Sequence, residues 1–366
     1  MEYYRDDHQN LLIRLLKSRG SDLLMQMYDA DKIRRNQVGD NVTFIRNQNI
    51  NFSNICYTGC KFCSFAAHEG SSHAYRLNQL ELEEQTAEAN NNNVTEICST
   101  AGLDPKSNLE TYINVLQTFK KFAPSVHVHA FSPYEIYYLA EKEDQDFEYI
   151  LKTLKNNGLM TLCGTAAEIL DPEVRDILCP GKLTSDLWIE IIKIAHGLGI
   201  NSTATMMYGH IDQVHNLAKH LQIIRGIQEE TKGFTEFIPL PFIHNNTYIY
   251  KTGLARAGST GMEDMAVYST SRLYLGEFIP NLQSSWVKTG MKFASLALSA
   301  GVNDLGGTLF EEKITRFAGG NHGTYMAESE FIRFIHDANR TAIRRDTLYN
   351  PIEVFPVDDY KVWIDL

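Results

Sequence analysis

The chain alternates short apolar or β-branched runs with segments of helical periodicity, and this alternation occurs eight times. In one such segment, Trp188, Ile191 and Ala195 fall on the same face of a helix. Strands that alternate with helices pair in parallel, and eight such units predict a closed α/β barrel of the (β/α)8 TIM type. The expected strands lie at residues 42–51, 95–100, 126–130, 160–164, 202–207, 235–240, 281–285 and 302–307.

The barrel is expected to span residues 41–310, with an addition at each end. Residues 1–40 carry leucines in a polar frame, which predicts an N-terminal helical cap outside the barrel. Residues 311–366 are interpreted as a C-terminal helical extension packed on the barrel. The chain of 366 residues is 43% hydrophobic, which is enough to bury one large core.

Three cysteines, Cys56, Cys60 and Cys63, lie within eight residues in a C-x3-C-x2-C pattern. A four-iron cluster normally takes four protein ligands, so a triplet without a close fourth cysteine leaves one iron free for another ligand. A structural zinc site usually has a second ligand pair further along the chain, and this sequence has none. The remaining cysteines are dispersed and are predicted to be buried core thiols: Cys98, Cys163 and Cys179.

The cysteine spacing resembles that of the radical S-adenosylmethionine (SAM) superfamily, and this resemblance implies two cofactors, a [4Fe-4S] cluster and SAM. In that superfamily SAM binds the free iron, and an electron from the cluster splits SAM into methionine and a 5′-deoxyadenosyl radical. Phe62 matches the aromatic residue that packs near the adenine of SAM.

Further motifs narrow the resemblance: HAFSPYEI from residue 129, GTAAEIL from 164, ATMMYGH from 204, TEFIPLPF from 235 and NDLGGTLFEE from 303. Over roughly residues 30–350 the chain is similar to the tyrosine-utilising radical SAM enzymes of deazaflavin biosynthesis, the group of the second FO synthase subunit. The wider group includes two menaquinone-pathway enzymes, aminofutalosine synthase and dehypoxanthine futalosine cyclase. Gly306-Gly307-Thr308 and Pro239-Leu240-Pro241 favour the deazaflavin member. The chain departs from the pattern at Cys163, where proline is common, and at Ala101, where glycine is usual.

The resemblance implies a transferase that joins L-tyrosine to 5-amino-6-(D-ribitylamino)uracil. Tyrosine would break between Cα and Cβ, and its 4-hydroxybenzyl fragment would add to C5 of the uracil. The implied partners are an electron donor and the first FO synthase subunit (CofG type), which closes the deazaflavin ring. Two alternatives remain: a menaquinone-pathway enzyme, and a non-catalytic cluster scaffold or electron carrier.

A TIM-type barrel carries its active site at the C-terminal ends of its strands, where several polar residues of this chain lie. For SAM, we expect Glu168 to accept a hydrogen bond, unless it pairs with a nearby Arg or Lys. The loop at Ala101 and Gly102 would let backbone approach the SAM amino group, or is a plain turn. Candidates for substrate binding or catalysis are His129, Ser132, Glu135, Tyr208, His210 and Asp304. The competing interpretations are a core histidine for His129 and a helix N-cap for Asp304.

The net charge argues against nucleic-acid binding, and the hydropathy argues against a membrane-spanning protein. The net charge is −11, whereas nucleic-acid binders usually present a basic stripe. The sequence has no run of 18 apolar residues, so no membrane span is expected. The first residues do not form a basic start followed by an apolar run, so we expect no signal peptide and a cytoplasmic protein.

Overall fold

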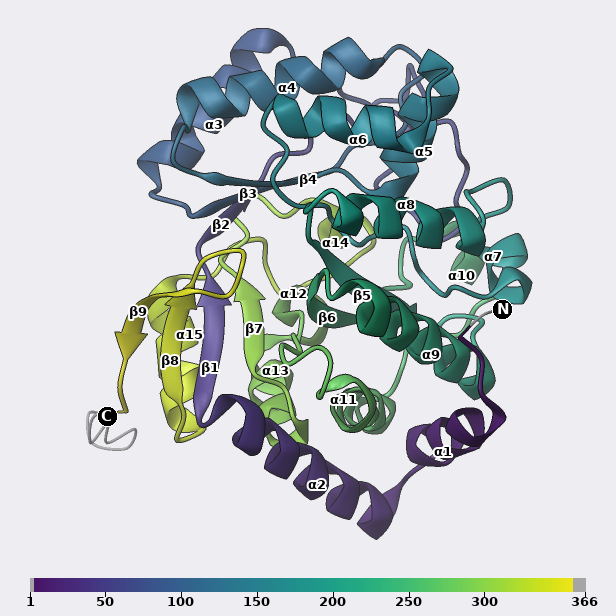
Figure 1. The fold of residues 1–366 in the computed structure, drawn as a ribbon, viewed down its shortest axis with the longest axis vertical. Helices are drawn as coiled ribbons and strands as arrows, with labels where there is room; N and C mark the ends of the chain where they lie inside the picture. Colours follow the sequence, from purple (N-terminus) through teal and green to yellow (C-terminus); the bar gives the residue numbers. More distant parts are fainter. Residues whose placement is uncertain (1–2, 358–366) are drawn as a thin grey trace.

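Eight parallel segments close into a barrel in the computed structural model, which describes residues 3–357 (Figure 1). The named barrel strands are β1 (Asn41–Ile45), β2 (Asn47–Asn49), β3 (Glu96–Ser99), β4 (His127–Ala130), β5 (Ser202–Tyr208), β6 (Phe234–Pro241) and β7 (Asp304–Gly307). The fourth and seventh positions hold only isolated bridges, at residues 161–162 and 282–283. The (β/α)8 fold expected from the alternation is therefore confirmed.

The bridges complete the circle. Thr161 pairs with His129 of β4 and Leu162 with Ser202 of β5, while residues 282 and 283 join β6 to β7 in the same way. The first predicted strand is divided at Arg46: β1 pairs with β7, whereas β2 pairs with β3. At Arg46 the chain therefore passes from the pairing of β1 with β7 to the pairing of β2 with β3, and this step closes the barrel.

Helices surround the barrel, as the sequence pattern predicts. In α8 (Ser185–Gly197), Trp188, Ile191 and Ala195 are fully buried. The other long surrounding helices are α3 (Gln79–Asn91), α4 (Leu109–Phe122), α5 (Pro133–Glu143), α6 (Phe147–Asn156), α9 (Val214–Thr231) and α11 (Gly261–Leu275). The shorter ones are α7 (Pro172–Leu178), α10 (Tyr248–Lys251), α12 (Trp286–Thr289), α13 (Met291–Ala297) and the 3₁₀ turn η1 (Leu298–Ala300). Within the described residues, no helix combines the length and the apolar character that crossing a membrane requires.

The C-terminal segment differs from the expected helical extension. It contains α14 (Ile314–Phe317) and α15 (Glu328–Asp337), but also β8 (Thr341–Arg345) and β9 (Pro351–Phe355). β8 pairs in parallel with β1, and β9 pairs antiparallel with β8 (Figure 1). The sequence TAIRR contains only two apolar residues, followed by two arginines, and gives a weak strand signal by itself. The strand therefore depends on pairing with β1, about 300 positions earlier in the chain. Residues 358–366 lie outside the described part.

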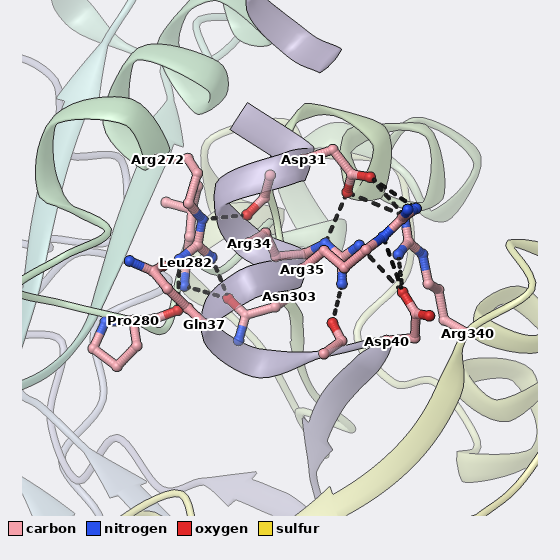
Figure 2. A network of polar contacts seen from close by, with 12 residues as sticks. Asp31, Arg34, Arg35, Gln37, Asp40, Arg272, Pro280, Leu282, Asn303 and Arg340 are labelled. Carbon is pink, nitrogen blue, oxygen red and sulfur yellow. Dashed lines mark hydrogen bonds and ion pairs between the residues drawn. The ribbon is translucent and has the colours of Figure 1, made fainter. Parts of the chain in front are cut away.

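The N-terminal helices α1 (Asp6–Leu16) and α2 (Gly20–Val38) pack against α9 and α11, outside the barrel (Figure 1). Figure 2 shows the polar network around α2. The fully buried Arg34 donates to Asp31 over 2.7 Å, and Arg340 bonds both Asp31 and Asp40. Next to Arg34, Arg272 of α11 donates to the carbonyls of Gly301 and Pro280, each over 2.7 Å (Figure 2). Arg272 also donates to Gln37 of α2 over 3.1 Å, so the network fixes α2 to the start of β8 and to α11.

Candidate active site

A cavity of about 440 Å³ lies inside the barrel and opens at the strands' C-terminal ends. All three clustered cysteines line it, together with Phe62. Its wall is made by inward-facing residues: Asn47, Glu96, Cys98, His129, Cys163, Thr203, Thr205, Met207, Glu236 and Gln283. The cavity thus holds thiols, acids and amides in a single enclosed space.

The cysteine loop follows β2 and is held by backbone bonds. The Cys56 amide donates to the Ala67 carbonyl, and the Lys61 amide donates to the Leu178 carbonyl, each over 3.0 Å. The Thr58 hydroxyl lies 3.2 Å from the Cys56 sulfur and 3.4 Å from the Cys60 sulfur. Two of the three thiols are therefore gathered around one hydroxyl, and Cys63 lies on the same cavity wall.

This donor set fits an iron–sulfur cluster. Burial raises the pKa of the Cys60 thiol, and it raises the pKa of Cys63 to about 11. These thiols would stay protonated at neutral pH unless a nearby cation held them as thiolates, which bound iron ions do. Three cysteines at one cavity wall can hold three corners of a four-iron cluster and leave the fourth iron open toward the cavity.

Glu168 lies in the loop after the fourth barrel segment and is almost fully buried. Its Oε1 accepts a hydrogen bond from Lys182 over 2.8 Å, while its Oε2 has no hydrogen-bond partner in the described structure. Burial lowers the pKa of Lys182, but the Glu168 carboxylate, Cys60 and Cys179 together outweigh burial and raise it above its usual range. The Lys182 ammonium also lies 5.4 Å from the Phe62 ring centre. The Oε2 atom lies 3.8 Å from the Arg175 guanidinium, an ion pair without a hydrogen bond. Both interpretations of Glu168 therefore have support: it is paired, and one of its oxygens can still accept a hydrogen bond at the cavity.

Ser132 and Glu135 form the capping box of α5, in which each side chain bonds the other residue's backbone amide. The same carboxylate accepts from the Ala101 amide over 3.0 Å. Burial raises the pKa of Glu135 to about 7, against the lowering effect of its bonds from Ser132. Both residues line the cavity, but these contacts give them a positioning role for the loop at Ala101.

Gly102 is needed for packing. A Cβ at this position would lie 2.3 Å from the carbonyl oxygen of Ile55, in the segment that leads into the cysteine loop. The glycine therefore lets the loop after β3 pack directly on the segment before Cys56. Ala101 and Gly102 both line the cavity, so the backbone is also close enough to contact a bound ligand.

Three predicted site residues lie elsewhere. The buried Tyr208 hydroxyl donates to Asp264 of α11 over 2.7 Å, and the His210 ring contacts the Met207 carbonyl. Neither lines the cavity, because side chains alternate along β5 and Met207 is the inward residue. Asp304 is fully buried at the start of β7, where it accepts from Arg345 and Thr43, each over 2.6 Å. It is neither a ligand-facing acid nor a helix cap.

Several residues that line the cavity were not predicted from sequence patterns. Lys182 lies in a loop far from any strand end, and Arg345 belongs to the unpredicted strand β8. Glu236 stands within the TEFIPLPF motif, and strand parity could have assigned it to the interior, whereas Lys288 belongs to the short helix α12. Burial raises the pKa of Glu236 to about 7 and lowers the pKa of Lys288, where Glu312 opposes the effect.

A (β/α)8 barrel with a C-x3-C-x2-C loop at its mouth defines the class of radical SAM enzymes. Residues 50–224 match the Radical SAM superfamily, and residues 231–355 match the family described as "CofH/MqnC C-terminal region". Among solved structures, methylornithine synthase has the same fold, with a TM-score of 0.72 at 16% identity over 91% of this chain and 93% of that one. The superfamily match gives the class, and the solved structure shows the same fold.

The particular family follows from closer relatives. The chain is 48% identical over 329 residues to the 5-amino-6-(D-ribitylamino)uracil–L-tyrosine 4-hydroxyphenyl transferase of Methanopyrus kandleri, covering 90% of this chain and 89% of that protein. It is 46% identical to the FO synthase of Mycobacterium leprae over 87% of this chain but only 37% of that longer protein. The chain belongs to the family of 5-amino-6-(D-ribitylamino)uracil–L-tyrosine 4-hydroxyphenyl transferases.

Proposed function

We propose that this enzyme cleaves L-tyrosine between Cα and Cβ and transfers the 4-hydroxybenzyl fragment to 5-amino-6-(D-ribitylamino)uracil, in the formation of the deazaflavin FO. The observation that carries the proposal is the 48% identity, over nine-tenths of the chain, to a protein named for this transfer. The cofactors are a [4Fe-4S] cluster and SAM, as in the superfamily that the chain matches.

Cys56, Cys60 and Cys63 would hold the cluster at the cavity mouth. The bound cluster and SAM together supply the one-electron chemistry that starts the reaction. The Oε2 of Glu168, which has no hydrogen bond in the described structure, would accept one from SAM, and Lys182 would hold that carboxylate in position.

Two charged residues at the cavity suit the amino acid head of tyrosine. Lys288 lines the cavity and can pair with a carboxylate. Glu312 accepts from the Thr315 amide through Oε1, while its buried Oε2 has no partner in the described structure and can accept from an ammonium. These two side chains would fix the Cα–Cβ bond relative to SAM.

The polar inner end of the cavity suits the ribitylaminouracil, which carries amides, amines and several hydroxyls. Glu236 accepts from Gln283 and from the Tyr349 hydroxyl, each over 2.7 Å. Asn47 donates to Glu96 over 3.1 Å. Such paired acids and amides bind a polar molecule at fixed points and displace water from the site.

The biological setting is part of the proposal. A first FO synthase subunit of CofG type would take the adduct and close the ring, with an electron donor serving the cluster. The Mycobacterium leprae FO synthase is long enough to contain more than the part matched here. All six cysteines are free, which suits the reducing cytoplasm.

An anaerobic assay with reconstituted enzyme, SAM, a reductant, tyrosine and the diaminouracil tests the function. Ring-labelled tyrosine is expected to deliver its label to a uracil adduct, and backbone-labelled tyrosine to deliver it to glyoxylate. The matched control omits the diaminouracil. Both labels in one product, or consumption of a futalosine-type compound instead, would refute the transferase while leaving the radical SAM class intact.

A further inference from the structure

We propose that Cys98, His129 and Cys163 form a binding site for one thiophilic divalent cation, with Zn²⁺ as the best fit, inside the barrel cavity. The ligand atoms of these three side chains all lie within 4.8 Å of one another. The three residues line the same cavity as the cysteine loop but belong to other strands. The site goes beyond the proposed transfer reaction, which does not require it.

The barrel brings the three side chains together by register. Cys98 of β3 stands opposite His129 of β4, and His129 bridges to Thr161 of the next barrel segment. Cys163 follows two residues after Thr161 and therefore points the same way, into the barrel. Side chains from three neighbouring strands thus converge at one height.

The sulfur–sulfur distance suits a metal. The Cys98 and Cys163 sulfurs lie 4.0 Å apart. Tetrahedral coordination with Zn–S bonds of about 2.3 Å places two sulfurs about 3.8 Å apart. A disulfide does not suit this arrangement, because β4 lies between the two cysteines. Two strand spacings of about 4.8 Å exceed the roughly 7 Å Cα separation that a disulfide tolerates.

The histidine has one ring nitrogen left for coordination. Its Nδ1 lies 2.8 Å from the Thr161 hydroxyl, and the described structure gives its Nε2 no hydrogen bond. A metal-ligating histidine typically bonds a polar group through its second ring nitrogen, which fixes the tautomer and the ring orientation. Burial lowers the pKa of His129, and its neutral form is the one that binds a metal.

Two consequences follow. Three protein ligands leave a fourth position, and the site faces the cavity, so that position is open to water or to an amine or hydroxyl of a bound molecule. A metal-bound thiolate also lacks the S–H hydrogen that a free thiol can give to a carbon radical. Of these two consequences, only the second, the loss of the S–H hydrogen, rests on the proposed function.

Metal analysis of the full-length, anaerobically reconstituted protein tests the site. After one equivalent of Zn²⁺ and desalting, the parent protein and Cys179→Ala, a buried thiol outside the trio, should each retain about one zinc, with about four irons per chain. Cys98→Ala and Cys163→Ala should bind zinc at least about tenfold more weakly, since loss of even an outer partner has that effect. Their iron content should not change.

Equal zinc retention in the parent and both variants overturns the proposal, as does a parent protein that retains none. X-ray absorption of the zinc-loaded parent gives a readout that does not depend on how the variants fold. Two sulfurs at about 2.3 Å and a nitrogen at about 2.0–2.1 Å support the site. Three or more sulfurs assign the zinc to the cysteine loop and refute it. None of these results depends on transferase activity.

Discussion

Glu168 combines two features that reduce the stability of a protein: a strained backbone conformation and a buried carboxylate oxygen without a hydrogen bond. Its backbone has a φ of +41°, a left-handed conformation that side-chain-bearing residues rarely adopt. Its carboxylate is buried, and only Oε1 accepts a hydrogen bond, whereas Oε2 lies 3.8 Å from Arg175 without one. A buried acceptor without a hydrogen bond reduces stability, so a ligand that donates to Oε2 would recover free energy on binding.

We therefore expect Glu168→Gln to weaken SAM binding on the order of tenfold to a hundredfold, which corresponds to about 1.5–3 kcal/mol for a hydrogen bond to a charged group. Titration of SAM into the reconstituted protein measures the affinity, and iron analysis should give an unchanged cluster. Glu173→Gln, at an exposed glutamate of α7, is the matched control. An affinity equal to that of the parent would make Glu168 a purely structural partner of Lys182.

The residues that sequence patterns could assign are those whose function is encoded locally. The Cys56–Cys63 spacing needs no knowledge of the fold. In contrast, Tyr208 and Met207 are neighbours, and which of them faces the cavity depends on the register of β5 in the closed barrel. Asp304 could be interpreted correctly only with its partner Arg345, which comes from a strand that the pattern did not reveal.

At the scale of elements, hydrophobic periodicity located the barrel strands well because each is a buried run between helices. It failed at β8, where two adjacent arginines follow two apolar residues and pairing to β1 decides the structure. It also gave no sign that α2 would carry a buried arginine. Arg34 is fully buried beside Asp31, and Arg340 reaches the same carboxylate from the residue just before β8 (Figure 2).

Loss of Arg34 should destabilise the protein strongly. Arg34→Ala removes the cation nearest to Asp31 and leaves a cavity, so we expect a loss of about 3–5 kcal/mol in unfolding free energy. Arg35→Ala is the control on the same helix, since Arg35 is exposed and lies 3.8 Å from Asp31; its effect should be about 1 kcal/mol or less. Urea unfolding under anaerobic conditions compares the two. Equal losses would show that the network in Figure 2 contributes little beyond surface pairing.

At the scale of the whole molecule, the C-terminal segment completes the barrel interior. Arg345 of β8 is buried between Asp304 of β7 and Glu236 of β6, with Nε–Oδ2 and Nη2–Oε2 distances of 2.6 and 3.8 Å. It also lies 3.8 Å from the Tyr349 ring centre. A segment interpreted from sequence as an outer extension thus supplies the cation that balances two interior acids.

Arg345→Met should lower the unfolding free energy by about 3–5 kcal/mol, because it leaves a buried acid without its cation. Adding Asp304→Asn removes the stranded charge, so the double variant should be more stable than Arg345→Met alone. Thermal or urea unfolding of the four proteins in this cycle gives the coupling. Additive losses in the double variant would mean that the ion pair contributes no coupling.

The barrel circle is not bonded equally all round. Most neighbouring strands share continuous ladders, whereas the segments at 161–162 and 282–283 hold their neighbours through single bridges. Because the paired stretch is short at these two positions, the free energy of local opening should be lowest there among the barrel strands. One of the two lies directly beside Cys163, so fluctuations that admit a large polar molecule to the interior would concentrate on the wall that carries the proposed metal ligands.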